Sequence, residues 1–447
     1  MAGLTLTLET AKHTLGNTQL YIQTVSNNIA NASDASYARQ VVNTTENSTV
    51  KIGNCLLGTG ASVASITQVR DAYIDKSLLG ATSHQSMYDA IISQLDTVQA
   101  YLADDGSTGL SAALSSFFDA WDSLSQSAST SAEQTSVYSY TQNLVDAITQ
   151  SYEDLTGTVE DMSSQIGDDV GSVNSLLTQI AEYNKAIVMA ETDGSCANDL
   201  RDARYEALTE LSKLVPVTYT EEANGSDTVT LTDGSTAVTL VEGFNSGSLS
   251  YDSSTNLISY TQADGTTVAP SSNSLDGGEI GGLFASIADT QSYLDSLNSF
   301  ASALITEVNS LQASGGTSVF SGTDASDIAM VSDFLDGVDS STETSIAASI
   351  ASLQDTEVAI GSTTTTFSDY LSGIQEQIGL DIQNATTKSD FYGTLVDTLT
   401  TKQQSVSGVS MDDELADLIK YQTIYQAAAK IISYVQDMLQ TVINMAQ

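Results

Sequence analysis

The sequence predicts a mainly α-helical, elongated protein: a long-helix or coiled-coil stalk closed by N- and C-terminal helices, with a small antiparallel β domain in the middle. Three observations support this fold class. Apolar residues recur at alternating steps of three and four near both ends of the chain, helical periodicity persists from about Thr130 to Ala190, and only two of the 447 residues are proline. Between the helical segments, one stretch alternates apolar and polar residues as β-strands do.

The first helix is expected to run from Leu4 to about Asn31. Its apolar residues follow steps of four and three in which Thr18 is the only polar member, and the asparagines near its end compete with the helix through local side-chain hydrogen bonds. A short extended segment follows, with glycine turns around Lys51 to Val63. The residues of this helix predicted to pack are Leu4, Leu8, Leu15, Ile22, Val25 and Ile29.

The next helices are expected to build the stalk. Helical periodicity returns from about Val69 to Leu102, and again from Leu110 to Leu124 with an aromatic cluster assigned to core packing. The segment from Thr130 to Ala190 repeats with a period nearer 3.6 than 3.5 residues, so it should form a straight rod about 90 Å long. A shorter helix, Leu200 to Leu214, ends before the proline that follows it.

The middle of the chain is expected to leave the helical pattern and then return to it. Residues 216–273 alternate apolar and polar side chains between Asn-Gly and Asp-Gly turns, which indicates an antiparallel β insert. Helical periodicity resumes from Gly282 to Leu311. The Gly/Ser/Thr-rich stretch from Ala313 to Thr366 should hold short elements and loops, and a helix from Phe367 to Gln403 should precede the last one.

The last helix is expected from Met411 to Gln447. Ser410 can cap its first turn, where residues 412–414 place three negative charges that the helix dipole favours. We expect its apolar seam to pack on the first helix, as an antiparallel or bundled coiled coil, or on adjacent copies; the alternative is that each seam belongs to an ordinary core helix of a globular domain. The seam consists of Leu418, Tyr421, Tyr425, Ala428, Ile432, Val435, Leu439 and Val442.

These elements predict a nested organisation in which the ends of the chain meet. Residues 1–60 with 404–447 would form a terminal helical domain, and residues 61–215 with 274–403 a helical stalk. Residues 216–273 would form an outward-facing β insert.

Composition and charge exclude several classes of function. The chain has 13 Lys and Arg against 56 Asp and Glu, a formal charge of −43, so nucleic acids and anionic membranes should repel it, whereas salty water outside the cell would suit it. No apolar run is long enough to cross a bilayer, and the N-terminus does not read as a secretory signal peptide. Cys55 and Cys196 are the only cysteines; we expect two unpaired, buried thiols, although one disulfide is compatible with the count.

No pattern of catalytic or cofactor-binding residues stands out. His13 and His84 lie on predicted helices without Cys or His at ligand spacing, which argues against zinc. Phosphate-binding loops, nucleophile elbows and metalloprotease motifs are missing. Acidic pairs such as Asp168 and Asp169 point in different directions on a helix and are assigned to a solvated face. The sequence therefore predicts no enzyme, no cofactor and no metal.

Both ends of the chain resemble a known family. The stretch from Val25 to Asn31, followed by Tyr37-Ala38-Arg39-Gln40, resembles the signature shared by bacterial flagellar rod, hook and hook-associated proteins, although Ala35-Ser36 replaces the usual Pro-Gly. Near the C-terminus, the acidic residues 412–414 and Lys420-Tyr421-Gln422 are similar to the FlgK family of hook-associated proteins and favour it over the hook protein. The motif residues are Ser26, Asn27, Asn28, Asn31, Tyr37, Arg39 and Gln422.

Internal segments extend the resemblance to most of the chain. Arg201-Asp202 with Leu211 to Val215 looks like the family's segment before its β domain, and Gly277 to Leu283 with Val308-Asn309 looks like the return to the stalk. Gln312 stands where the family often has a histidine.

The resemblance implies a structural protein that forms a ring between the flagellar hook and the filament, allows filament assembly, and acts outside the cell. Its implied partners are other copies of itself, the hook protein, the second hook–filament junction protein, the flagellar export apparatus and an export chaperone that binds the C-terminal helix. We further expect the terminal helices to be largely disordered before assembly, because isolated helices are marginally stable. The alternatives are another flagellar axial protein (the hook protein or the second junction protein), or a secreted acidic adhesin or calcium-binding surface protein.

Overall fold

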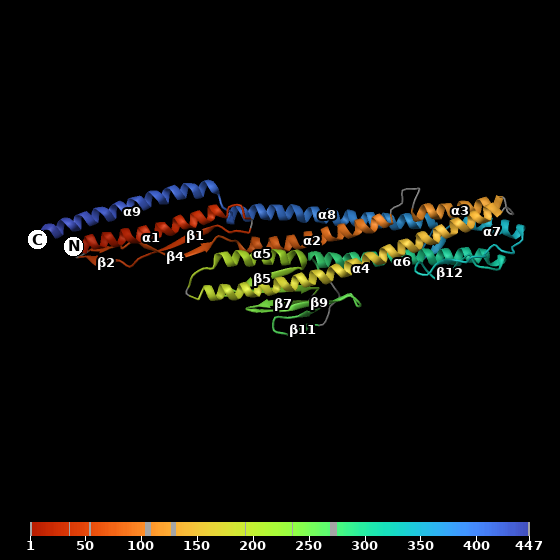
Figure 1. Ribbon diagram of the computed structural model, residues 1–447, viewed down its shortest axis with the longest axis horizontal. Helices are drawn as coiled ribbons and strands as arrows, with labels where there is room; N and C mark the ends of the chain where they lie inside the picture. The colour runs from red at the N-terminus through yellow and green to blue at the C-terminus, as the bar shows by residue number, and fades with distance from the viewer. Residues whose placement is uncertain are drawn as a thin grey trace.

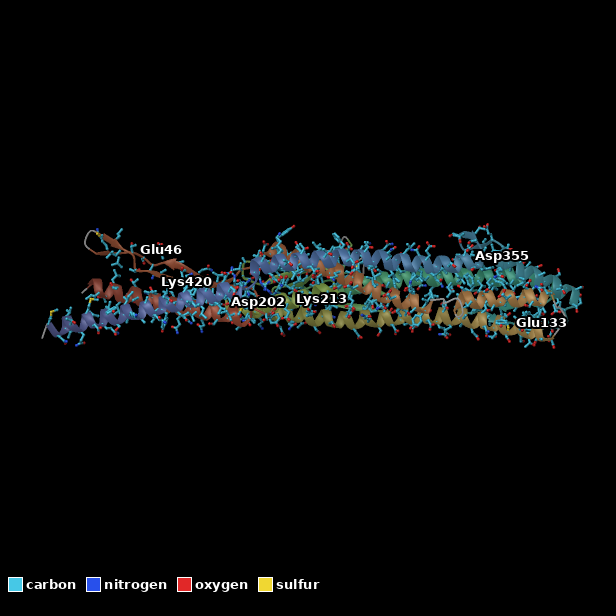
Figure 2. All side chains as sticks on the ribbon, turned by 90° about the horizontal axis from the view of Figure 1, so that it is seen from above. Glu46, Glu133, Asp202, Lys213, Asp355 and Lys420 are labelled. Atoms are coloured by element: carbon cyan, nitrogen blue, oxygen red, sulfur yellow. The ribbon has the colours of Figure 1, made fainter. Side chains whose placement is uncertain are left out.

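The computed structural model describes the chain except for residues 1, 35, 53–54, 103–108, 127–130, 193, 235, 269–274 and 446–447, and the side chains of Ala2 and Ile52. The described residues form an elongated molecule in which both termini lie at the same end (Figure 1). Seen from above, Glu46 and Lys420 lie toward this end and Glu133 and Asp355 toward the opposite one (Figure 2). The expected fold class, mainly helical with a β insert, is confirmed.

Two antiparallel helices form the terminal end. Helix α1 (Ala2–Ala30) lies beside α9 (Met411–Met445) (Figure 1). The rings of Tyr21 and Tyr421 stack between them with their centroids 4.4 Å apart. As expected, the hydroxyl of Ser410 caps α9 by accepting a hydrogen bond from the backbone N–H of Asp413 at 3.4 Å. The first and last segments of the chain therefore fold against each other within one molecule.

A β-ribbon accompanies α1. Strand β1 (Gln40–Glu46) pairs with β4 (Ala61–Gln68) and shifts register once between Asn43 and Thr44, while β2 (Val50–Ile52) and β3 (Cys55–Leu57) form its tip. The side chain of Asn17 on α1 donates to the backbone oxygen of Ala61 at 2.6 Å. The ribbon is much longer than the short extended segment expected, because its Thr-, Ser- and Asn-rich strands lack the apolar alternation that marks a half-buried strand.

Among the described residues, the six longest helices between the terminal ones form the body of the stalk. Helix α2 packs against α6 and α8, and α4 packs against α3, α5 and α6. The 60-residue helix α4 runs without interruption, as the sequence predicted, while α8 continues to Ser407, beyond its expected end at Gln403. The helices are α2 (Ala72–Tyr101), α3 (Leu110–Gln126), α4 (Ser131–Ala190), α5 (Asn198–Leu214), α6 (Gly278–Gln312) and α8 (Phe367–Ser407).

Two apolar cores hold the stalk together. One lies at the end away from the termini, where Phe118 of α3 packs on Phe367 and Trp121 of α3 packs on Phe334. The other joins α4, α5 and α6 to the β insert. Among the described residues, the buried members of these cores begin at Leu79 and end at Ala385. The terminal domain is therefore attached to the stalk by other contacts.

The β insert consists of two small antiparallel sheets beside α4 and α5 (Figure 1). Arg204 of α5 contacts Asp227 of the first sheet at 2.9 Å, and the amide of Asn184 on α4 bonds the backbone of Asp227 in both directions. The sheets are β5 (Val217–Glu221), β6 (Asp227–Asp233), β7 (Thr236–Glu242) and β8 (Asn245–Ser246), and β9 (Ser248–Asp252), β10 (Leu257–Thr261) and β11 (Thr267–Val268).

Short elements occupy residues 313–366, as expected. The most regular is α7 (Ser340–Ser352), whose first turn is capped by Asp339 accepting from the backbone N–H groups of Ser341 and Thr342. The others are η1 (Ala313–Gly315), β12 (Phe320–Ser321), β13 (Ala329–Met330), η2 (Leu353–Asp355), β14 (Val358–Ile360) and β15 (Thr363–Thr365).

The structure corrects one expectation about the cysteines. Cys55 and Cys196 are both free, but both are exposed instead of buried. Cys55 lies at the tip of the ribbon, where two strands cannot enclose a side chain, and Cys196 lies in the turn between α4 and α5. In the described part of the chain, no helix is long and apolar enough to span a membrane.

Candidate assembly site: the terminal helices and their joint to the stalk

The predicted seam of α1 faces α9 and the ribbon. Val25 is buried together with Ala11 and Thr18, which occupy intervening seam positions. The remaining predicted packing residues, Leu4, Leu8, Leu15, Ile22 and Ile29, are half-buried.

The predicted seam of α9, which we call the inner seam, is covered to a similar degree. Ala428 and Val435 are buried, whereas Tyr425 remains 38% exposed. Leu418, Tyr421, Ile432, Leu439 and Val442 are half-buried. The structure thus brings the two seams together in a single chain, and their part in packing between copies stays a prediction.

A second apolar seam on α9 was not recognised from the sequence. It repeats the three-and-four steps on the flank of the inner seam from Ile424 to Met438 and resumes one heptad later, with the polar Thr441 at the intervening position. We call it the outer seam: Ile424, Ala427, Ile431, Tyr434, Met438 and Met445. All six residues are exposed, with Tyr434 at 67% and Met445 at 76%. A shallow groove of about 520 Å³ runs between this seam and Leu4 of α1. The spacing was present in the sequence, but reading one seam per helix hid it.

The motif residue Asn28 joins three elements. Its side-chain oxygen accepts from the hydroxyl of Tyr37 at 2.8 Å and from the backbone N–H of Gln40 at 3.0 Å. Its amide nitrogen donates to the backbone oxygen of Gln40 at 3.0 Å and to a carboxylate oxygen of Glu414 at 3.1 Å. Asn28 is 1% exposed, so this one side chain ties α1 to β1 and to the start of α9 with four buried hydrogen bonds.

The groups around Asn28 are electrostatically constrained. Glu414 is 6% exposed, and its burial raises the pKa of the carboxyl group, although the bond from Asn28 acts in the other direction. Burial likewise raises the pKa of Tyr37, helped by the nearby carboxylate of Asp202, so the phenol keeps the proton that it donates. The cluster is built for a fixed arrangement of hydrogen bonds.

The other motif residues divide between structure and surface. Asn31 donates to the side chain of Asn27 at 3.1 Å, which fixes the end of α1, and the backbone N–H of Arg39 donates to the backbone oxygen of Ser407 at 2.8 Å. Ser26 and Gln422 are exposed on α1 and α9.

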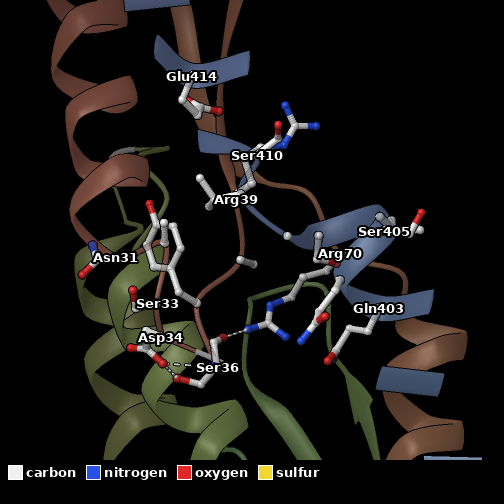
Figure 3. A pocket seen from close by; sticks show the side chains of 18 of the residues that line it. Asn31, Ser33, Asp34, Ser36, Arg39, Arg70, Gln403, Ser405, Ser410 and Glu414 are labelled. Carbon is white, nitrogen blue, oxygen red and sulfur yellow. Dashed lines mark hydrogen bonds between the residues drawn. The ribbon is translucent and has the colours of Figure 1, made fainter. Parts of the chain in front are cut away.

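Below Asn28, a polar joint connects the terminal domain to the stalk. The guanidinium of Arg70 donates to the backbone oxygen of Ser36 at 2.8 Å (Figure 3). It also pairs with Asp202 at 2.5 Å and lies 4.4 Å from the ring centroid of Tyr205. Gln403 of α8 donates to Asp75 at 2.6 Å and to the hydroxyl of Tyr205 at 3.0 Å. These contacts link α2, α5 and α8 to the segment that follows α1.

The joint borders a cavity of about 620 Å³ that is open to solvent. Residues 31–34 and 36–39 line one side and residues 403–410 the other, with the side chains of Arg39 and Arg70 between them (Figure 3). Within the described residues, no group of three or more His, Cys, Asp or Glu side chains lies close enough together to hold a metal ion. The arrangement holds chain segments in place.

Comparison with known proteins identifies the family. The protein family described as "Flagellar hook-associated protein FlgK helical domain" matches residues 95–328, more than half of the chain. The chain belongs to the FlgK family. A second description, of the C-terminal segment of flagellar basal body rod proteins, matches residues 402–445.

Individual relatives agree with this assignment. Flagellar hook-associated protein 1 of Bacillus subtilis is 24% identical over 98% of this chain and 97% of its own length. The protein of the same name from Salmonella typhimurium is 30% identical over 49% of this chain and 40% of its own length. The solved structure of the flagellar hook junction protein FlgK from Burkholderia pseudomallei is similar over 74% of this chain and 100% of its own, with a TM-score of 0.60 and 16% identity. The predicted family and the predicted structural role in the bacterial flagellum are therefore confirmed.

Proposed function

We propose that this protein is a ring-forming subunit of the junction between flagellar hook and filament. The observation that carries the proposal is the outer seam of α9, whose six apolar positions are exposed although the inner seam of the same helix is buried or half-buried at every position except Tyr425. Burying one large apolar side chain contributes about 1.5–3 kcal/mol, so covering this seam would strongly favour association with another copy. Two seams on one helix suit a protein that packs on itself and on neighbours.

The domain organisation fits this role. We propose that residues 1–60 with 404–447 form the assembling domain, residues 61–215 with 274–403 the stalk, and residues 216–273 an insert that faces outward. The upper limit of the insert falls on residues that the structure does not describe. The insert is held rigidly, because Arg204 and Asn184 fix its first sheet to two stalk helices.

The proposed partners are the hook protein on one side of the ring and the second junction protein on the other. We also propose that the chain leaves the cell through the flagellar export apparatus, and that an export chaperone covers α9 before assembly. The exposed outer seam supports a chaperone, since an uncovered apolar stripe on a long helix would promote aggregation. Ordering of the terminal helices would then accompany assembly.

Deletion of the gene tests the proposal. We expect hooks to be made while filament protein is lost to the medium, and immunogold labelling of the complemented strain to mark the hook–filament boundary. A complementing variant, Ile431→Glu with Met438→Glu, should fail to restore filaments. The matched control, Ser433→Glu with Gln440→Glu, places the same charges at exposed polar positions between the seam residues and should restore them. Normal filaments in the deletion strain, or label along the whole filament, would contradict the proposal.

A further inference from the structure

The charge of the chain is distributed very unevenly. Of the 56 acidic residues, eight lie in residues 1–60 and 404–447 with five of the 13 lysines and arginines, so the terminal domain carries a net charge of −3. The other 48 acidic and eight basic residues give residues 61–403 a net charge of −40. The terminal domain, which carries the outer seam, is almost neutral, and nearly all of the charge lies on the stalk and insert.

The basic residues of the stalk do little to offset this charge on its surface. Three arginines form ion pairs with carboxylates of the same chain: Arg70, Arg201 and Arg204. Lys213 likewise pairs with Glu210. The acidic residues, in contrast, line the outer surface of the longest helix, where the exposed ones include Glu153, Glu160, Asp161, Asp168 and Glu182.

Like charges are crowded even within one stalk. Burial and the neighbouring carboxylates of Glu279 and Asp168 raise the pKa of Asp169 to about 6. Burial raises the pKa of Asp289 on α6, and the carboxylate of Asp381 on α8 adds to the effect. A second stalk placed alongside would bring further carboxylates toward a surface on which carboxylates far outnumber the exposed lysines, which are Lys76, Lys185, Lys388 and Lys402.

We propose that ionic strength controls the assembly of this protein: the neutral terminal domain seats on a second copy through its apolar seam, and the charge of the stalks opposes that contact unless salt screens it. The inference rests on the proposed function, because a ring holds neighbouring stalks side by side. The screening length is about 8 Å at 0.15 M salt and about 3 Å at 1 M, so repulsion between stalks falls steeply over this range. The apolar contact is not weakened by the same change.

Binding of the purified full-length protein to isolated hooks tests the inference. Hooks are prepared from a strain in which the gene is deleted, mixed with the protein at NaCl concentrations from 0.05 to about 1 M, and pelleted to measure the bound fraction. We expect the apparent affinity to rise about tenfold or more across this range. A variant with neutral amides at five exposed positions of α4 should bind at lower salt: Glu153→Gln, Glu160→Gln, Asp161→Asn, Asp168→Asn and Glu182→Gln.

The outcomes separate this inference from the proposed function. Binding of the wild-type protein that is equal at all salt concentrations would overturn the salt control and leave the junction role intact. An identical salt response in the neutralised variant would also overturn it, because salt would then act on the apolar contact alone. Absence of binding at every salt concentration would overturn the proposed function itself. Circular dichroism of both proteins at low and high salt checks that the change in binding is not a change in folding.

Discussion

Replacing Asn28 by aspartate should detach the start of α9 from α1. The side-chain nitrogen of Asn28 donates to Glu414 at 3.1 Å and to the backbone oxygen of Gln40 at 3.0 Å. Aspartate has the same shape but puts an acceptor oxygen at that position. Both hydrogen bonds are lost, and two carboxylates meet in a site where the present one is 6% exposed.

The expected cost follows from the contacts removed. The neutral hydrogen bond contributes about 1 kcal/mol and the one to a carboxylate about 1.5–3 kcal/mol. Repulsion between the two carboxylates adds to this loss until one of them binds a proton. We therefore expect the substitution to destabilise the contact between α1 and α9 by about 3–5 kcal/mol at pH 7. The folded state would hold that proton more tightly than the unfolded state. The loss should therefore be largest above the raised pKa of the carboxylate pair and should shrink as the pH falls toward the ordinary carboxyl range.

Hydrogen exchange read by mass spectrometry measures this local effect. Peptides covering the first turns of α9 and the last turns of α1 should exchange faster in the variant at pH 7, with partial recovery near pH 5 after correction for intrinsic rates. The matched control is Asn27→Asp, because Asn27 is only half-buried and its amide donates a single long bond of 3.4 Å. Unchanged protection of α9 in the Asn28 variant, or equal effects in both variants, would refute the reasoning.

Three further changes have defined outcomes. The pKa of Asp169 is raised to about 6, so the folded state binds the proton more tightly than the unfolded state and the free energy of unfolding should fall as the pH rises from 4 to 7. Asp169→Asn should remove about 1 kcal/mol of this pH-dependent loss, a figure lowered because the side chain is partly exposed, and thermal unfolding at several pH values measures it. Gly408→Ala should loosen the turn between α8 and α9, because its Cβ would lie 2.3 Å from a backbone oxygen, and peptides there should exchange faster. Arg204→Ala should cost about 3–5 kcal/mol by leaving a buried carboxylate unpaired, and should expose the β insert to limited proteolysis.

Each of these changes has a control in the same chain. Asp161→Asn removes an exposed charge and should leave the pH dependence intact. Gly379→Ala lies within α8, meets no atom within 4 Å, and should be neutral or stabilising by about 0.5–1 kcal/mol. Lys213→Ala breaks an exposed ion pair and should leave the insert resistant to protease. A control that matches its test variant would count against the corresponding mechanism.

Periodic elements could be predicted from the sequence with good accuracy. The ends of α1, α4 and α5 fall within a few residues of their expected positions, because each has a continuous apolar stripe and a turn signal at its end. The β-ribbon was underestimated because its polar strands gain their partners from each other and from α1, which no local pattern records.

The candidate site was predicted only in part. The motif pointed to Asn28, Tyr37 and Arg39, but it could not show that Asn28 bonds Glu414, because the two residues are 386 positions apart in the chain. Arg70 and Gln403, which join the terminal domain to the stalk, had no sequence signal, since isolated polar residues acquire a role only from the partners that surround them.

The sequence by itself determined the helices, the insert and the family, because period, turn chemistry and short motifs are properties of neighbouring residues. The tertiary structure alone decided which apolar face is covered. Inner and outer seams of α9 have the same spacing and similar side chains, yet α1 covers one and leaves the other exposed. That difference depends on where a distant segment packs, and it is the difference on which assembly of this protein is proposed to depend.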